Sequence, residues 1–256
     1  MTKKVAKNQE SQVSNYDYSR DGGSGFENIT SEDMAVPFMY LTQSLSHQAK
    51  GKDSVAKEGD FYNSVTGRVY PDGFTMIPCL TKHNYIERDD DDNFRGVHEK
   101  DSDVVVSAKA NGRSFGKIPL GNGNYLIETF SVFALIIDGE SVTQAILPFK
   151  STGIKKYKNF ITTARSVTMK TAGGGIIPFP LFAHRWRVTS IEQKSDKGDF
   201  ANWAITFENG TAEESRVDPE SDEYAMAKAF IEAVNTGNAK VNFNQDKASN
   251  EEELPI

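Results

Sequence analysis

The stretch Tyr125-Leu-Ile-Glu-Thr-Phe-Ser-Val-Phe-Ala-Leu-Ile-Ile-Asp138 is the longest extended run of this chain and decides its fold class. It is dense in aromatic and β-branched side chains, which favour strands. Asp138-Gly139 ends the run with a turn signal, and the residues from Ser141 to Phe149 are the predicted antiparallel partner across that turn. A hairpin of two long strands is therefore expected at the centre of the protein.

Downstream of this hairpin the apolar spacing becomes helical. Ser151 and Thr152 provide a cap for a helix predicted from Thr152 to Met169. Its apolar side is formed by Ile154, Tyr157, Phe160, Ile161, Ala164 and Val167. After it we expect strands from His184 to Ile191 and from Asn202 to Phe207, and an amphipathic helix from about Ser221 to Val234.

Upstream, turn residues separate short apolar pieces between Gly59 and Leu80, which predicts β-hairpins there. Thr30-Ser31-Glu32-Asp33 combines a hydroxyl cap with acidic first-turn residues and predicts a helix start. This helix either ends before Pro37 or restarts from Phe38 to Leu45. Because the order of elements shows no β-α-β alternation, the chain is predicted to be mostly β with α, an antiparallel barrel or sheet with an inserted helix and a C-terminal helix.

The bulk properties narrow the class of protein. No apolar run approaches the roughly 20 residues that span a bilayer, and the start Met1-Thr-Lys-Lys has no apolar signal segment, so a soluble intracellular protein is expected. Cys79 is the only cysteine, which excludes an internal disulfide, and we interpret it as a buried apolar residue. The four histidines form no metal-binding pattern, and no cofactor or metal is expected.

Two motifs that resemble ligand sites are better explained otherwise. The run Glu87-Arg-Asp-Asp-Asp-Asp92 is acidic, but consecutive carboxylates cannot all point at one ion, so a solvated loop is favoured over a metal site. The glycine run that follows Ala172 lacks the Gly-Lys-Ser/Thr ending of a phosphate loop. Nucleotide hydrolysis is therefore not predicted.

Charge is segregated along the chain. The protein has a formal net charge of −7, yet the 51 residues from Ser141 to Ile191, here called the acid-free segment, contain no Asp or Glu. The segment's eight basic residues are Lys150, Lys155, Lys156, Lys158, Arg165, Lys170, Arg185 and Arg187. With these set aside, 21 basic residues face 36 acidic ones elsewhere, a net charge of −15. A solvated helix face does not account for the missing acids, so an anion-binding face is predicted.

Aromatic rings are interleaved with these cations, as in grooves for single-stranded nucleic acid, where cations follow phosphates and rings stack on bases. The predicted stacking rings are Tyr157, Phe179 and Phe182, with core packing as the alternative for the two phenylalanines. Phe160 lies on the apolar side of the helix and is predicted to be core.

Strand alternation in His184-Arg-Trp-Arg-Val188 places Arg185 and Arg187 on one side and Trp186 in the core. The two guanidinium groups would lie about 6.6 to 7 Å apart, near the spacing of successive phosphates. One groove lined by both arginines and by the lysines of the helix is therefore expected.

The C-terminal end resembles a recruiting tail. A linker low in apolar residues runs from Asn235 to Asn250 and leads to the tip Glu251, Glu252, Glu253, Leu254, Pro255 and Ile256. Acids followed by proline and an aliphatic residue resemble the tails of bacterial and phage single-stranded-DNA-binding proteins, although Ile stands where that family ends in Phe. The resemblance implies recruitment of replication and repair proteins and competition with DNA for the basic groove; a frayed acidic terminus is the alternative.

Three segments of the body, Asp33 to Gln48, Gly59 to Gly67 and Met76-Ile-Pro-Cys79, resemble early-region proteins of tailed phages. Some of those proteins are regarded as single-stranded-DNA-binding proteins. The resemblance implies a phage replication context and does not locate the DNA contacts.

Together these features predict a non-enzymatic, sequence-independent single-stranded-DNA-binding protein of a bacteriophage, acting in DNA replication, recombination or repair in the cytoplasm of the infected host. The predicted parts are a flexible N-terminal arm (1–28), one nucleic-acid-binding domain with a core like that of oligonucleotide-binding (OB) barrels (29–236), and a flexible acidic tail (237–256) that binds replication or recombination proteins. Whether RNA also binds, and whether the protein forms oligomers, is open.

Two rival functions follow from the same residues. The first is a phage interaction protein, a host-factor inhibitor or transcription accessory, whose basic face binds an acidic partner. The second is a metal-dependent nuclease, which would require clustered carboxylates near the basic residues. Only Asp138 and Glu140 form a close pair there, and both belong to a predicted turn.

Overall fold

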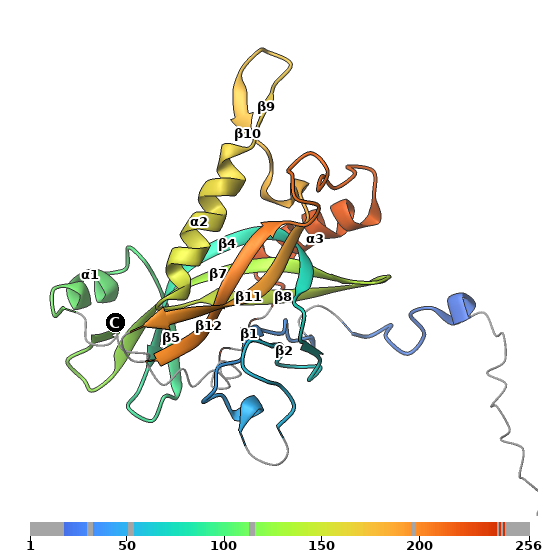
Figure 1. Ribbon diagram of the computed structural model, residues 1–256. Helices are drawn as coiled ribbons and strands as arrows, with labels where there is room; N and C mark the ends of the chain where they lie inside the picture. The colour runs from blue at the N-terminus through green and yellow to red at the C-terminus, as the bar shows by residue number, and fades with distance from the viewer. Residues whose placement is uncertain are drawn as a thin grey trace, which may run out of the picture.

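The computed structural model describes residues 18–29, 33–50, 54–112, 116–195, 198–239, 241 and 243. Antiparallel strands dominate these residues, and helices pack against them, so the fold is α+β as predicted (Figure 1). No helix among the described residues is both long enough and apolar enough to cross a bilayer.

Two long strands form the centre of the main sheet. β4 (Phe74–Arg88) and β7 (Tyr125–Asp138) pair antiparallel, from Thr75 opposite Ile137 to Arg88 opposite Tyr125. β7 turns back into β8 (Ser141–Phe149), which pairs with it from Asp138 to Phe130. The long hairpin predicted from the sequence is therefore confirmed.

The main sheet has the strand order β12-β11-β4-β7-β6, with β5 pairing on β4 and β8 on β7. Its remaining strands are β5 (Phe94–Glu99), β6 (Lys117–Pro119), β11 (Trp186–Ser195) and β12 (Gly198–Phe207). The sheet is open and does not close into a barrel. Of the two predicted forms, barrel or sheet, the sheet is the one observed.

A small second sheet lies between the outer strands β8 and β12. It consists of β1 (Met39–Leu41), β2 (Phe61–Asn63) and β3 (Val69–Tyr70). Phe38 makes a parallel bridge to Ile146 of β8, and the Gln43 side chain exchanges two hydrogen bonds with the backbone of Ala201 in β12. The β1 segment thus links β8 to β12, two strands that would be hydrogen-bonded to each other in a closed barrel.

The prediction of a helix from Phe38 to Leu45 is wrong, because this segment contains strand β1. Phe38-Met-Tyr-Leu41 is a continuous apolar run, and such a run has no period that separates strand from helix. In the structure successive side chains enter different cores: Met39 and Leu41 face one, Phe38 and Tyr40 the other. Only the presence of apolar partners on both sides makes the extended form favourable. Thr30, Ser31 and Glu32, where the helix start was predicted, lie outside the described residues.

Three α-helices belong to the described part of the chain: α1 (Asp103–Lys109), α2 (Gly153–Ser166) and α3 (Asp222–Asn235). The Ser221 hydroxyl accepts a hydrogen bond from the Tyr224 backbone N–H at 3.3 Å and caps α3, close to the predicted start. α2 ends before the predicted Met169, because Thr168–Lys170 forms strand β9, which pairs with β10 (Ile176–Pro178). Short 3-10 helices occur at Tyr18–Asp21, His47–Ala49 and Leu181–Ala183.

The central strands are buried on both faces, which explains their nearly continuous apolar sequence. In β7, Val132 and Ala134 face a core that α2 and the small sheet cover, whereas Phe133 and Leu135 face a core that α3 covers. α2 and α3 therefore lie on opposite faces of the sheet. α1 covers the far end of the α2 face, where Val105 packs with Tyr85 and Leu126.

Candidate nucleic-acid interface

Helix α2 separates apolar from basic side chains. Phe160 is buried in the core under the helix, as predicted, and Tyr157 is buried beside it. Lys155, Lys158 and Arg165 are exposed on the outer side. Within the described chain, none of these three cations has a carboxylate within the 4.0 Å of an ion pair. We call this outer side the α2 cationic face.

Three other basic residues of the acid-free segment lie close in sequence to this face. Lys170 is exposed on β9, directly beyond the end of α2. Lys150 and Lys156 are half-buried, at the turn before the helix and on its flank. The α2 cationic face and Lys170 are therefore the most accessible part of the predicted anion-binding surface.

Arg185, directly before β11, and Arg187, within it, do not belong to that surface. Trp186 and Val188 are buried beneath α2, where the Trp186 ring lies edge-on to Phe160 at 4.8 Å between centroids. Alternation therefore directs Arg185 and Arg187 to the opposite face of the sheet. The predicted alternation is correct, but the single groove that combined these arginines with the lysines of α2 is not formed.

Both arginines have partners within the protein. The Arg185 guanidinium pairs with Glu223 of α3 at 2.6 Å, and Arg187 donates to the backbone carbonyl of Asp72. These contacts join β11 to a helix and to the turn before β4. Their role in this structure is to hold the sheet to its neighbours.

The three rings predicted to stack on bases are all at least half-buried. Tyr157 is 7% exposed and packs against Phe130 and Phe149, so it leaves no free face for a base. Burial also raises the pKa of its hydroxyl. Tyr157 is therefore a core residue, because the helix places it on the apolar stripe that the sequence already shows.

Phe179 and Phe182 follow the alternative that was left open for them, packing against the body. The Phe179 ring lies 5.2 Å from that of His184, and the Arg216 guanidinium lies 5.0 Å from its centroid. Phe182 packs edge-on to Tyr224 of α3 at 5.0 Å. Burial lowers the pKa of His184, and the nearby Arg216 lowers it further.

The sheet face beside α2 carries a polar cluster that the sequence analysis missed. His83 of β4 stacks on Phe130 of β7 at 3.9 Å between centroids, and its Nε2 lies 3.0 Å from Oε1 of Glu128. The Tyr85 hydroxyl donates to the same carboxylate oxygen at 3.2 Å. Nζ of Lys158 lies 5.9 Å from the Phe130 centroid, so this cluster borders the α2 cationic face.

This cluster adds little positive charge to the face. Burial lowers the pKa of His83, and the Glu128 carboxylate offsets this only in part, so the imidazole is protonated less readily than a free histidine. The cluster depends on pairing 45 residues apart in the sequence, which strand alternation alone does not reveal. The only signal in the sequence is the spacing of two, His83 to Tyr85 and Glu128 to Phe130, which places each pair on one face.

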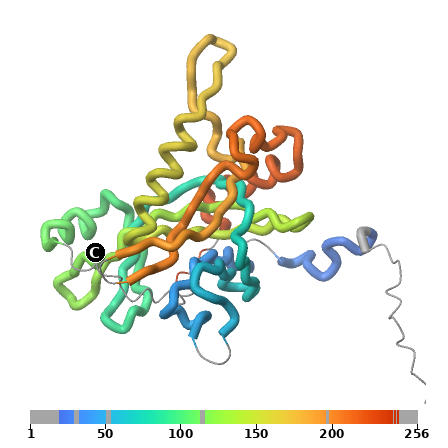
Figure 2. Tube along the Cα trace, viewed as in Figure 1, coloured from blue at the N-terminus to red at the C-terminus, as the bar shows by residue number. Residues whose placement is uncertain are grey.

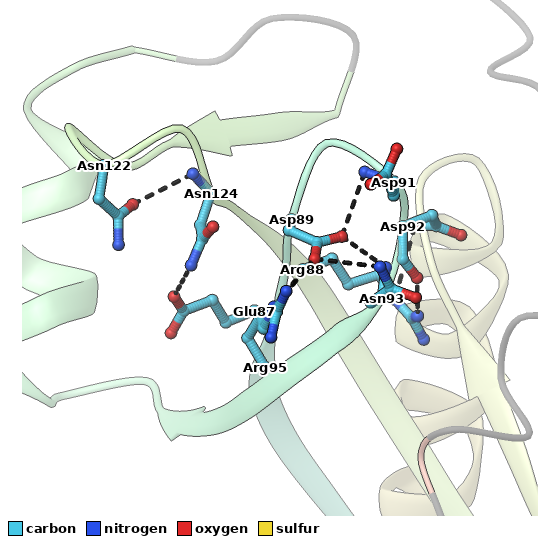
Figure 3. Close-up of polar contacts among 9 residues, drawn as sticks. All are labelled: Glu87, Arg88, Asp89, Asp91, Asp92, Asn93, Arg95, Asn122 and Asn124. Atoms are coloured by element: carbon cyan, nitrogen blue, oxygen red, sulfur yellow. Dashed lines mark hydrogen bonds and ion pairs between the residues drawn. The ribbon is translucent and has the colours of Figure 1, made fainter.

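The acidic run is a hydrogen-bonded turn between β4 and β5 (Figure 3). The Asp89 carboxylate accepts hydrogen bonds from the backbone N–H groups of Asp91 and Asn93 and pairs with Arg95. Desolvation raises the pKa of Asp89, but the hydrogen bonds from Asn93 and Arg95 outweigh it and bring the pKa to about 2. No cluster of three or more metal-ligating side chains occurs among the described residues.

Two further predictions concern single residues. Cys79 is 4% exposed, and burial raises the pKa of its thiol to about 12, so its interpretation as a buried apolar residue is confirmed. Asp138, one of the two carboxylates considered for a nuclease, forms an ion pair with Arg68.

The predicted tail tip Glu251 to Ile256 lies outside the described residues.

Comparison with known proteins assigns the chain to a family. The family model described as Pam3 phage gp34-like protein matches residues 6–240, most of the chain. No curated protein and no solved structure matches the chain. The phage context predicted from the sequence is therefore confirmed, while binding of single-stranded DNA stays a prediction. The chain belongs to the Pam3 phage gp34-like protein family.

Proposed function

We propose that this phage protein binds single-stranded DNA without regard to sequence, acts in phage DNA replication, recombination or repair inside the infected cell, and is not an enzyme. The observation that carries the proposal is the α2 cationic face: three exposed cations without carboxylate partners in the described chain, within a segment that has no acid in 51 residues. In a protein of net charge −7, such a face attracts a polyanion and the remainder repels it.

The mechanism is electrostatic. α2 has 14 residues and is about 21 Å long, and its cations extend over about 15 Å of it, with Lys155 and Lys158 one turn apart and Arg165 two turns beyond Lys158. A phosphate backbone that follows the helix exchanges its counterions for these side chains. Since the predicted rings are packed against the protein, stacking contributes less than in aromatic-lined grooves, and the affinity depends on salt.

The acidic tail would have a separate role. We propose that Glu251 to Ile256 binds replication or recombination proteins, since a short segment ending in acids, proline and aliphatics offers both charge and an apolar anchor. Its removal should leave DNA affinity equal or higher and abolish recruitment. A loss of DNA affinity on that deletion would contradict the tail's proposed role.

The test is a fluorescence-polarisation titration of labelled oligo-dT, the matched RNA and the matched duplex at two or more salt concentrations. We expect oligo-dT to bind more tightly than duplex. The triple variant Lys155→Ala/Lys158→Ala/Arg165→Ala should lower the log-log salt slope for oligo-dT by about 2, because each phosphate contact contributes about 0.7. An unchanged slope would exclude the α2 cationic face.

The matched control removes the same charge elsewhere. Arg20, Lys57 and Lys228 are exposed and lie outside the acid-free segment, so Arg20→Ala/Lys57→Ala/Lys228→Ala should leave the slope within experimental error. If both triple variants lower the slope equally, binding reflects overall charge and not a site.

The second candidate, binding of an acidic protein, is favoured by one observation: the predicted stacking rings Tyr157, Phe179 and Phe182 are at least half-buried. A cationic helix without free rings also suits an acidic peptide. Binding of neither oligo-dT nor duplex by the wild-type protein would support this candidate and overturn the first.

A further inference from the structure

The β9–β10 hairpin is an arm that extends from the end of α2. In Figures 1 and 2 it projects beyond the rest of the protein at the top of the view. Its two strands pair antiparallel, with Ile176 opposite Lys170 and Ile177 opposite Met169. The arm therefore extends the α2 cationic face away from the sheet.

Hydrogen bonds fix the shape of this arm at its tip and at its base. At the tip, the backbone N–H of Thr171 donates to the Gly175 carbonyl at 2.8 Å, and the Thr171 hydroxyl accepts from the Gly175 N–H at 3.1 Å. At the base, the Phe179 N–H donates to the Val167 carbonyl at 3.0 Å. The packing of the Phe179 ring between His184 and Arg216 then anchors the arm to the body.

The arm exposes apolar side chains that nothing in the described chain covers. Ile176 is 68% exposed and Ile177 44% exposed, and the next residue, Pro178, is also exposed. A two-stranded hairpin that buries little apolar area gains little stability on its own. A preorganised arm with adjacent exposed isoleucines is therefore expected to bury them against a ligand.

Charge narrows the chemistry of that ligand. Arg165 lies near the base of the arm and Lys170 on it, and the acid-free segment brings no carboxylate to it. We therefore expect a partner that combines negative charge with an apolar surface. The end of a nucleic-acid duplex has both, since it exposes the face of its terminal base pair between two phosphate backbones, and aliphatic side chains are known to wedge against base steps.

We propose that the β9–β10 hairpin is a wedge that inserts where single-stranded DNA meets duplex. Strand alternation places Ile176 and its cross-strand partner Lys170 on one face, against the terminal base pair and its phosphates, and Ile177 on the other face, against the first unpaired base. This inference rests on the proposed function, because α2 holds the single strand that leads to the junction. A wedge held between the last base pair and the first unpaired base keeps the two from re-stacking, so the protein promotes strand separation at forks.

The experiment compares a forked duplex that carries a dT arm with the dT arm alone. Binding is measured by polarisation, and strand separation by a fluorophore and quencher on the two strands. We expect wild-type protein to bind the fork more tightly and to open it. Ile176→Ser/Ile177→Ser should lose about ten- to hundredfold in fork affinity, because the exposed parts of the two side chains together amount to about one isoleucine, with dT affinity unchanged.

The matched control is Val55→Ser/Val65→Ser, which changes two valines that are 60% and 51% exposed outside the arm. It should bind and open the fork like wild type. Equal fork activity of the Ile176→Ser/Ile177→Ser variant and wild type would overturn the wedge while leaving single-strand binding in place. If wild type does not bind dT, the proposed function itself fails, and the wedge fails with it.

A second copy of the chain is the other partner that could cover the isoleucines. Analytical ultracentrifugation of wild type and of the Ile176→Ser/Ile177→Ser variant, both without DNA, tests it. We expect the same sedimentation for both. A dimer of wild type that the substitutions dissociate would assign the arm to self-association and overturn the wedge.

Discussion

Helix α2 and the first part of strand β11, up to Ile191, belong to the same acid-free segment, and each has cations on one side and a large ring on the other, yet their cations have different roles. Lys155, Lys158 and Arg165 of α2 are exposed, whereas Arg185 and Arg187, beside and within β11, contact Glu223 and the Asp72 carbonyl. The rings of both elements meet in one core, so the cations must point to opposite faces. Basic residues that are close together in the sequence therefore need not lie on one surface.

The shared interface between the two elements should give the largest effect when it is broken. Phe160 is 3% exposed and its ring lies 4.8 Å from that of Trp186. Phe160→Ala should lower the free energy of unfolding by about 3 to 5 kcal/mol, since it removes buried apolar area and leaves a cavity. Urea unfolding followed by circular dichroism measures this.

The exposed Thr162→Ala on the same helix is the control for Phe160→Ala, and it should change the free energy of unfolding by less than about 0.5 kcal/mol. A comparable loss in both variants would mean that α2 stability depends on the helix backbone and not on the core beneath it.

The turn before β4 also packs against β11, and Gly73 tests how closely. Gly73 has φ +80°, and a Cβ built there would lie 2.0 Å from the Val188 carbonyl oxygen of β11. Gly73→Ala should therefore cost about 2 kcal/mol or more in unfolding free energy, from the left-handed backbone and the clash together.

Gly139 separates these two causes. Its φ is +60° but a Cβ there meets nothing within 4 Å, so Gly139→Ala should cost only the backbone part, about 1 kcal/mol. Equal losses for the two variants would show that β11 yields to the added methyl group.

The ion pair between Arg185 and Glu223 should have a smaller effect. Their side chains are 36% and 22% exposed, so solvent screens the pair. A double-mutant cycle with Arg185→Ala and Glu223→Ala should give a coupling free energy of about 0.5 to 1 kcal/mol. Arg185→Ala should leave the salt slope of oligo-dT binding unchanged. If Arg185→Ala lowers the salt slope as much as the loss of one cation from α2 does, Arg185 contacts the DNA.

The smallest effect concerns pH. Because burial lowers the pKa of His184 below its ordinary value of 6.5, the unfolded chain binds a proton more readily than the folded one. Stability should therefore be complete above pH 6.5 and fall as the pH drops below it. His184→Gln removes this titration, so unfolding curves between pH 7 and 5.5 should show a shallower loss than wild type. Equal slopes would exclude His184 as a contributor.

Much of the fold could be predicted because its signals are local. The β7–β8 hairpin, the apolar stripe of α2, the Ser221 start of α3 and the burial of Trp186 each follow from period or capping within one element. Strand β1 could not be predicted, because its run of apolar residues is explained only by two cores that other parts of the chain build.

The candidate site was predicted only where its signals are local. Amphipathic spacing correctly places Lys155, Lys158 and Arg165 on an exposed face. It cannot show that Tyr157 is covered by Phe130 and Phe149 or that His83 meets Glu128, because those contacts depend on the register of distant strands.

The sequence by itself determined which elements form, which side of each is apolar, and that positive charge is confined to one segment of an acidic chain. Only the tertiary structure decided which cations share a surface. The face that a strand residue occupies is fixed locally, but what covers that face depends on where the helices pack. Here Glu223, 38 residues beyond Arg185, arrives with α3 on the face opposite α2 and neutralises an arginine that the sequence alone places with the lysines.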